Sequence, residues 1–179
     1  ISTAARKGNA KVLEELIRRG GSPQEGFEDA LRYKQTAAFA LLLEKGAQAN
    51  QESMRIAVGY GFVDGVRLLI AQGIDSNLAF SSGEYPLHIV ATSYEDHDLA
   101  MIGELMKAGA DINVKNRNGE TPLHLAIQGG PDNKTLIDTF IELGANLKAK
   151  TKNGDAPIDY ALDKELKSYL KKVIKRKNS

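Results

Sequence analysis

One apolar pattern recurs five times along this chain, and each copy ends at a glycine. The glycines are spaced by 26, 27, 36 and 35 residues, and they are Gly20, Gly46, Gly73, Gly109 and Gly144. The residues three, four and seven positions before each of them are apolar. This spacing places the apolar side chains on one face of a helix, and glycine accepts the left-handed conformation that closes a helix. The sequence therefore predicts a helical repeat protein.

A shorter helix is expected before the recurring one in each copy. The first copy begins inside such a helix, at residues 3–9, and the recurring helix follows at 12–17. The next two copies predict the helix pairs 27–33 with 36–44 and 54–60 with 63–71. At the other end, the chain predicts a final helix with Leu166, Leu170, Val173 and Ile174 on one side.

The most informative stretch is 118–126, which reads Asn-Gly-Glu-Thr-Pro-Leu-His-Leu-Ala. Thr121 can cap a helix start with its hydroxyl group, and Pro122 suits the first helical turn because its missing N–H needs no partner there. Asn-Gly suits a tight hairpin tip. With Gly-Ala-Asp-Ile-Asn at 109–113 and Gly-Ala-Asn at 144–146, this stretch resembles one complete ankyrin repeat.

The resemblance implies an all-α solenoid formed by a single ankyrin repeat domain over residues 1–179. Its repeats would span about 1–22, 23–49, 50–76, 77–112, 113–147 and 148–179. The second and third repeats lack the Thr-Pro-Leu-His start and are about seven residues shorter than the family's period of about 33. We therefore expect short β-hairpins in the C-terminal half only. The fourth and fifth repeats carry a few extra residues between their helices, around 94–98 and 130–133.

Composition excludes several other classes of protein. Charged residues make up 26% and hydrophobic residues 42% of the chain, and the net charge is +1, which is not typical of a nucleic-acid binder or of an acidic disordered protein. The absence of Cys excludes disulfides and thiolate metal sites. No apolar run approaches the roughly 20 residues of a membrane helix, and no signal peptide opens the chain. We expect a cytoplasmic monomer without cofactor, metal, small-molecule substrate or membrane contact, and, because residue 1 is not Met, a fragment of a longer chain.

Three stretches resemble chemical sites, and the repeats explain each of them better. Residues 59–65 have the glycine spacing of a loose dinucleotide-binding loop, but they join two helices instead of following a strand. Residues 130–135 end in the Lys-Thr of a phosphate loop but lack its glycines. His97 lies among Glu95, Asp96 and Asp98, which we interpret as a solvated loop.

His88 and His124 are interpreted as structural residues. They stand 36 positions apart, in successive repeats, so the repeats do not bring them together with a nucleophile or a metal-binding set. In the family, this histidine bonds to the threonine and the backbone at the helix start. His88 faces Tyr85 in place of that threonine, and Asp159 stands where a third histidine would be, so weaker versions are expected there.

Partner-binding residues follow from the resemblance alone, since ankyrin proteins usually bind a partner protein on the concave face, at the hairpin tips and the ends of the first helices. The matching positions are Arg32, Tyr33, Tyr60, Ser81, Ser82, Glu84, Thr92, Ser93, Lys115, Arg117, Asn118, Glu120, Gln128, Lys152 and Asn153. Tyr33 and Tyr60 occupy equivalent places in adjacent repeats. They are either rigid anchors for a partner or they pack into the space that the missing hairpins leave.

The resemblance implies a non-enzymatic protein–protein interaction module. One alternative, motivated by the absence of an initiator Met, is a targeting domain of a larger enzyme or secreted effector whose catalytic part is absent from this chain. Irregular repeats are common in bacterial and intracellular-pathogen ankyrin proteins, so delivery into a host cell is one setting that the resemblance implies. A second alternative is a nucleic-acid or nuclear-import role for the basic tail, where Glu165 is the single acid among the cations Lys164, Lys167, Lys171, Lys172, Lys175, Arg176 and Lys177. The same charges also suit the negative end of a helix dipole.

Overall fold

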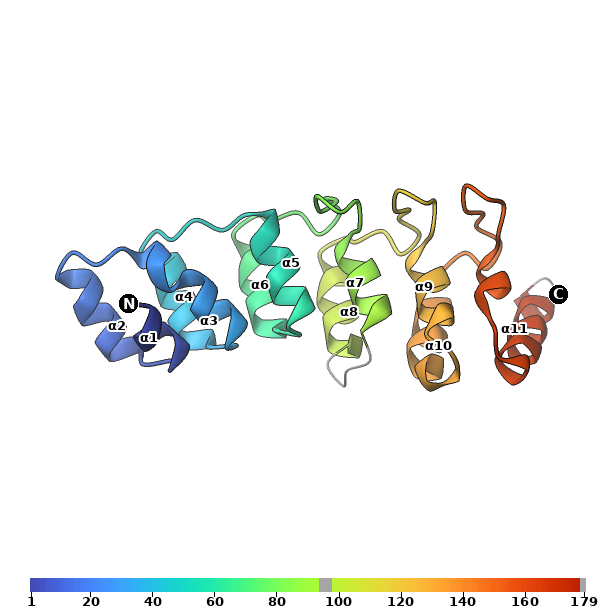
Figure 1. The fold of residues 1–179 in the computed structure, drawn as a ribbon, viewed down its shortest axis with the longest axis horizontal. Helices are drawn as coiled ribbons and strands as arrows, with labels where there is room; N and C mark the ends of the chain where they lie inside the picture. Colours follow the sequence, from blue (N-terminus) through green and yellow to red (C-terminus); the bar gives the residue numbers. More distant parts are fainter. Residues whose placement is uncertain (94–97, 178–179) are drawn as a thin grey trace. The chain divides into compact units, whose positions relative to one another are not determined.

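The computed structural model describes residues 1–93 and 98–177, which form two compact units, Ile1–Leu78 and Ala79–Ser179. We refer to them as the N-terminal unit and the C-terminal unit. Within each unit, consecutive helices pair and the pairs stack, as Figure 1 shows. A helical repeat array is therefore confirmed, while a single domain over residues 1–179 stays a prediction.

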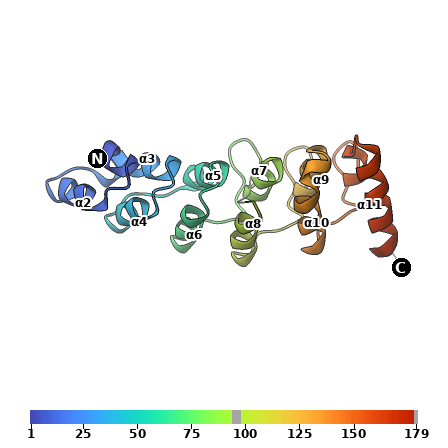
Figure 2. The same cartoon turned by 90° about the horizontal axis from the view of Figure 1, so that it is seen from below.

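The N-terminal unit contains three helix pairs. They are α1 (Ser2–Arg6) with α2 (Ala10–Arg18), α3 (Phe27–Arg32) with α4 (Thr36–Glu44), and α5 (Gln51–Gly59) with α6 (Val63–Ala71); a short 3₁₀ helix, η1 (Pro23–Gly26), precedes α3. Among the first helices, α3 contacts both α1 and α5, and among the second helices, α4 contacts both α2 and α6 (Figure 2). The predicted helices at 36–44 and 63–71 are confirmed with the same bounds.

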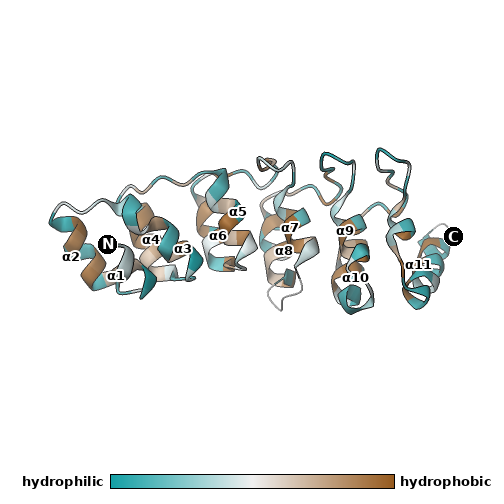
Figure 3. Ribbon diagram, viewed as in Figure 1, coloured by the Kyte–Doolittle hydropathy of each residue, from teal (hydrophilic) through white to brown (hydrophobic). Residues whose placement is uncertain are grey.

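Apolar side chains from both helix layers are buried in the core. Figure 3 shows the apolar residues of each helix in brown on the ribbon. The residue seven positions before each repeat glycine is buried in all five copies: Leu13, Phe39, Val66, Ile102 and Ile137. In the N-terminal unit the ring of Phe39 lies 5.0 Å from that of Phe27 and 5.8 Å from that of Phe62, measured between centroids. The five repeat glycines all have φ between 85° and 97°, as their helix-closing role predicts.

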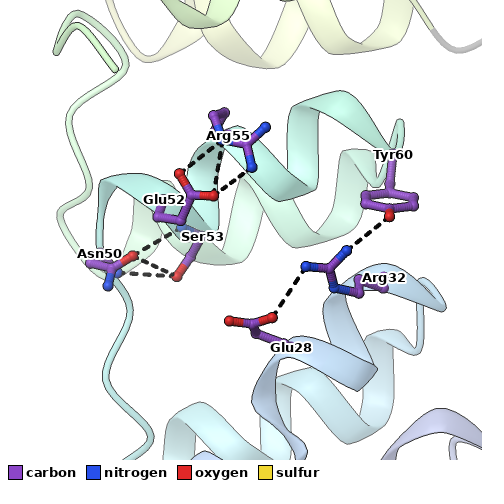
Figure 4. Close-up of polar contacts among 7 residues, drawn as sticks. All are labelled: Glu28, Arg32, Asn50, Glu52, Ser53, Arg55 and Tyr60. Atoms are coloured by element: carbon purple, nitrogen blue, oxygen red, sulfur yellow. Dashed lines mark hydrogen bonds and ion pairs between the residues drawn. The ribbon is translucent and has the colours of Figure 1, made fainter. Parts of the chain in front are cut away.

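In the N-terminal unit, Asn50 caps the start of α5, the first helix of a repeat that lacks the Thr-Pro-Leu-His motif. At α5 the Asn50 Oδ1 atom accepts a hydrogen bond of 3.0 Å from the backbone N–H of Ser53, and the Ser53 Oγ atom accepts one of 3.2 Å from the backbone N–H of Asn50 (Figure 4). This reciprocal pair is a capping box, and it satisfies two backbone donors that the helix itself cannot pair.

The C-terminal unit contains α7 (Pro86–Thr92) with α8 (Asp98–Lys107), α9 (Pro122–Gln128) with α10 (Lys134–Glu142), and α11 (Lys164–Lys177). Two 3₁₀ helices, η2 (Pro131–Asn133) and η3 (Pro157–Tyr160), precede α10 and α11. The sixth repeat thus has only the short turn η3 in place of a first helix. Leu166 and Leu170 of α11 are buried, as the predicted apolar side of the last helix requires.

Three loops of the C-terminal unit, residues 80–84, 116–120 and 151–155, correspond to the expected β-hairpins, and we call them fingers. In each, the first residue donates a backbone hydrogen bond to the fifth and accepts one from the fourth; the bonds from Asn116 to Glu120 and from Gly119 to Asn116 are both 2.9 Å. No strand occurs in residues 1–93 or 98–177. The expected β-hairpins are therefore corrected to tight turns, because one closing pair of hydrogen bonds does not extend into a ladder.

The length and apolar content of the helices decide whether any of them could cross a membrane. Among the helices that the structure describes, none combines the length and the apolar content that crossing a bilayer requires.

Candidate functional site

The fingers of the fourth and fifth repeats enclose a groove with the ends of α7 and α9. It has a volume of about 550 Å³, and its lining residues are Ser82, Gly83, Glu84, Thr92, Asn116, Arg117, Asn118, Glu120, Leu125 and Gln128. We call it the inter-finger groove. Seven of these ten residues were predicted to contact a partner, and they come from four separate segments of the chain. The fold brings these predicted residues to one site.

Buried histidines hold two of the three fingers in place, those at 116–120 and 151–155. The Nδ1 atom of His124 accepts hydrogen bonds from the backbone N–H of Thr121 at 3.0 Å and from its hydroxyl group at 2.8 Å. The proton of the ring therefore sits on Nε2, which donates to the carbonyl of Asp155 at 3.3 Å, in the next finger. Burial lowers the pKa of His124, so the neutral form is favoured. One side chain thus ties a helix start to the following finger.

His88 repeats this arrangement in a weaker form, as predicted from Tyr85. Its Nδ1 atom accepts from the backbone N–H of Tyr85 at 3.3 Å, while Nε2 donates to the carbonyl of Glu120 at 2.9 Å. Burial also lowers the pKa of His88. Both histidines are fully buried and all their ring nitrogens have partners, so they support the groove from behind and do not line it.

Glu120 forms a fixed, ionised wall of the groove. Its carboxylate accepts hydrogen bonds from the Tyr160 hydroxyl at 2.7 Å and from the side-chain amides of Asn116 at 2.8 Å and Asn118 at 3.2 Å. Burial raises the pKa of Glu120, but the hydrogen bonds from Asn116, Tyr160 and Asn118 outweigh it and lower the pKa overall. Burial and the bond to Glu120 raise the pKa of Tyr160 to about 12. This carboxylate is therefore charged and held in one orientation.

The side chain of Arg117 extends from the finger of the fifth repeat, residues 116–120, to the finger of the fourth repeat, residues 80–84. Its Nη2 atom donates to the carbonyl of Ser81 at 2.7 Å, and its aliphatic stem lies against Gly83. A Cβ atom on Gly83 would lie only 2.3 Å from Cγ of Arg117, and φ of Gly83 is +88°, so glycine is required there on both counts. The absence of a side chain at position 83 therefore lets the arginine bridge two fingers at the rim of the groove.

The remaining predicted residues of the C-terminal unit lie outside the groove. The hydroxyl group of Ser93 donates to buried Asp98 at 2.5 Å, which connects the two helices of the fourth repeat. Lys115 donates to the carbonyl of Lys150 at 2.8 Å, between fingers. Lys152 and Asn153 are exposed at the tip of the last finger. Lys152 and Asn153 thus extend the rim by one repeat, whereas Ser93 and Lys115 have structural contacts.

Sequence reasoning missed two side chains of the groove, Asn116 and Leu125. The Oδ1 atom of Asn116 accepts from the backbone N–H groups of Asn118 and Glu120, at 2.9 and 3.0 Å, and so shapes the fifth finger. The Asn-x-Asn-Gly order of the finger was a readable signal for such an Asx turn. Leu125 gave no signal, because an apolar residue after the histidine also fits a helix core.

The predicted residues Arg32, Tyr33 and Tyr60 belong to the N-terminal unit and form a separate cluster. Tyr33 is 51% exposed and Tyr60 is 45% exposed. Each ring has an arginine of the preceding repeat over it, with Arg6 Cζ 5.3 Å from the Tyr33 centroid and Arg32 Cζ 5.7 Å from that of Tyr60. Half of each tyrosine therefore remains available to a partner.

The stretches set aside in the sequence lie where the repeats predict. Residues 59–65 form the turn between α5 and α6, and residues 130–135 lead through η2 into α10. His97 lies outside the described residues. Within the described part of the chain, no group of three or more His, Asp or Glu side chains is placed to hold a metal ion.

The basic last helix packs through its apolar side and exposes cations along the other. Lys164, Lys171, Lys172 and Arg176 are exposed, while the ammonium group of Lys177 donates to the carbonyl of Ile141 at 3.0 Å. That carbonyl is near the end of α10, so one tail cation neutralises the negative end of a neighbouring helix.

Comparison with known proteins covers most of the groove but neither its residues 82–84 nor the N-terminal unit. A family model described as ankyrin repeats in three copies matches residues 87–178, slightly more than half of the chain. The match includes Thr92, α9 and the fingers at 116–120 and 151–155, and it begins just after the finger at 80–84. The curated proteins contain no match.

Proposed function

The chain belongs to the ankyrin repeat family, whose members are generally protein–protein interaction modules, and we propose that this chain binds a partner protein in the inter-finger groove. The observation that carries the proposal is the convergence of Arg117, Glu84 and Gln128, with their neighbours, on one groove of about 550 Å³. These side chains come from fingers and helix ends of two successive repeats.

The lining chemistry favours a protein segment over a small molecule. Small-molecule sites are mostly apolar with a few polar groups, whereas Leu125 is the single apolar side chain among the ten residues that line this groove. The others offer amide, hydroxyl, carboxylate and guanidinium groups, which can pair with the main chain and polar side chains of a peptide. Several are fixed beforehand by bonds to the protein, which reduces the entropy lost on binding.

We also propose that the groove binds without catalysis. A general acid or base needs a proton that can move, and the carboxylate of Glu120 is held ionised by three donors. His88 and His124 are buried behind the fingers, where both nitrogens of each ring are already paired. The charged groups of the groove are therefore suited to recognition.

Site-specific photocrosslinking tests the proposal. A photoreactive amino acid replaces exposed Gln128 in one variant and exposed Glu142, at the end of α10, in a matched control. In lysate of the source cell, we expect discrete protein adducts from position 128 that are absent from position 142. The same adducts from both positions, or none from position 128 in a folded variant, would contradict a partner site in the groove.

A further inference from the structure

The N-terminal unit carries arginine–tyrosine pairs that join one repeat to the next. The Arg32 Nη1 atom donates to the hydroxyl of Tyr60 at 2.9 Å, and its guanidinium lies over the ring of that residue, as described above (Figure 4). Arg6 lies over Tyr33 in the same relation, one repeat earlier. We call the surface formed by Arg6, Lys7, Arg32, Tyr33, Lys34 and Tyr60 the Arg–Tyr face.

Each guanidinium is oriented but retains free donors. Arg6 pairs with Asp29 at 3.6 Å, and Arg32 pairs with Glu28 at 3.3 Å. The side chains of Arg6 and Arg32 are nevertheless 50% and 43% exposed. Since a guanidinium carries five N–H donors in a planar fork, both arginines can still bind an incoming carboxylate in a fixed geometry.

Lys34 adds a cation at a position where its backbone is strained. Its φ is +55°, and among the described residues it is the only non-glycine with positive φ. The equivalent position after the first helix is Gly8 in the preceding repeat, with φ +68°, and Gly61 in the following one, with φ +65°. Strained backbone is often retained at functional sites, and here the strained residue is an exposed lysine that directly follows Tyr33 in the chain.

The charge of the face selects the ligand. The exposed cations Arg6, Lys7, Arg32 and Lys34 outnumber the carboxylates of Glu28 and Asp29, and the neighbouring Glu52–Arg55 ion pair adds no net charge. Two half-exposed tyrosines add rigid amphipathic contact area. We propose that the Arg–Tyr face binds an extended acidic segment of a partner protein. The proposal rests on the proposed function only in taking a protein segment as the ligand.

The repeat spacing fixes the register of the acidic residues. Packed helices lie about 8–10 Å apart, and a segment in the extended polyproline II conformation rises about 3.1 Å per residue with three residues per turn, so every third side chain faces the same side. A peptide running across α1 and α3 therefore presents about one residue in three to each repeat. The preferred ligand has Asp or Glu at every third position.

A single-stranded nucleic acid fits this face less well. Such strands stack their bases on open aromatic rings, and guanidinium carbons 5.3 and 5.7 Å from the two tyrosine centroids leave only part of each ring open to a base. The carboxylates of Glu28 and Asp29 would also repel phosphate groups. A peptide can instead place uncharged residues beside those carboxylates.

Fluorescence polarisation on the whole chain tests the proposal with a labelled peptide of five Glu-Ser-Gly triplets. The comparison peptide has the same composition with its five Glu residues contiguous. We expect the triplet peptide to bind about fivefold more tightly, and binding to weaken as salt rises. Absence of binding up to millimolar peptide, equal affinity for both peptides, or tighter binding of a fifteen-nucleotide oligo(dT) would overturn the proposal.

Two variants separate the role of charge from loss of folding. Lys34→Gly removes a cation while relieving the strained backbone, so we expect about fivefold weaker peptide binding together with a melting temperature about 2–4 °C higher. Lys45→Ala removes a cation at the far end of the same helix pair, and we expect unchanged binding. Unchanged binding by Lys34→Gly, or an equal loss in Lys45→Ala, would contradict the assignment.

Two further measurements test the inter-finger groove independently of the Arg–Tyr face. Gln128→Arg should leave binding of the triplet peptide unchanged, and Lys34→Gly should leave the crosslinks from position 128 unchanged. If the triplet peptide binds but position 128 gives no specific crosslinks, the groove proposal fails. If the crosslinks form but the triplet peptide does not bind, the proposal for the Arg–Tyr face fails.

Discussion

The two units of this protein build the same helix pair with different supports. In the N-terminal unit, turns without fingers join the repeats, and a cluster of Phe27, Phe39 and Phe62 links the pairs through apolar contact. In the C-terminal unit, fingers project from the helices, and buried His88 and His124 join each helix start to the next finger. The difference shows that the same helix pair can be supported by apolar contacts alone or by apolar contacts together with buried histidines, and that the finger at 80–84 forms without a histidine in the repeat before it.

The largest loss of stability is expected when a ring is removed from the apolar cluster of the N-terminal unit. Phe39→Ala removes a fully buried ring, which typically costs about 3–5 kcal/mol of the free energy of unfolding. Hydrogen exchange followed by mass spectrometry reads the two units separately, and we expect lost protection in the N-terminal unit. Val12→Ala, at a 45% exposed position of the same unit, is the control. A cost below about 1 kcal/mol would show that the ring cluster is not the main support.

A somewhat smaller loss is expected from the polar support of the C-terminal unit. His124→Ala leaves the N–H of Thr121 without its partner and removes one of the two hydrogen bonds to the carbonyl of Asp155, at a cost of about 2–3 kcal/mol. Protection should fall in residues 116–120 and 151–155. Gln128→Ala, on the exposed side of the same helix, should change little. If protection of both fingers survived in His124→Ala, the histidine would not be what holds them.

Acid should weaken only the C-terminal unit. Burial lowers the pKa of His88 and His124, so below the ordinary histidine value of about 6.5 the unfolded chain binds more protons than the folded one. The free energy of unfolding therefore falls as the pH is lowered from about 6.5. All three histidines of the sequence lie at positions 88, 97 and 124, so the N-terminal unit has none.

Urea denaturation followed by NMR signals from each unit, at pH 7.5, 6.5 and 5.5, checks this prediction. His124→Gln should reduce the pH dependence of the C-terminal unit. An equal loss of stability in both units would indicate that another group causes it.

The smallest effect has the opposite sign. Lys34→Gly replaces the strained residue by one that accepts positive φ, and we expect the free energy of unfolding to rise by about 1 kcal/mol. Thermal or chemical denaturation measures it, with Lys45→Ala as the charge-matched control. A decrease in stability would show that the Lys34 side chain makes stabilising contacts that outweigh the strain.

The sequence predicted the helices well because their apolar spacing is a local signal. The position seven residues before each repeat glycine is buried in all five copies, and the helices at 36–44 and 63–71 have the predicted bounds. The β-hairpins were wrong, since an Asn-Gly tip predicts a turn but not how many hydrogen bonds follow it. In the fifth finger the turn closes at Asn116 and Glu120 and goes no further.

The candidate site was predictable where the family pattern is strong and less so elsewhere. Resemblance identified Arg117, Glu120 and Gln128, which do line one groove. It also selected Ser93, whose hydroxyl group is engaged with Asp98, because side-chain partners depend on folding and not on position in a repeat. The cation over Tyr60 could not be predicted, since it joins residues 28 positions apart in helices with no diagnostic motif.

The central claim is that the inter-finger groove binds a partner protein, and the affinity of the protein captured from position 128 tests it most directly. Isothermal titration compares the wild-type chain with Gln128→Arg, which fills the groove, and with Glu142→Arg, which adds the same charge at the end of α10. We predict at least about tenfold weaker binding for Gln128→Arg and an unchanged affinity for Glu142→Arg. An unchanged affinity in a folded Gln128→Arg variant would contradict the claim.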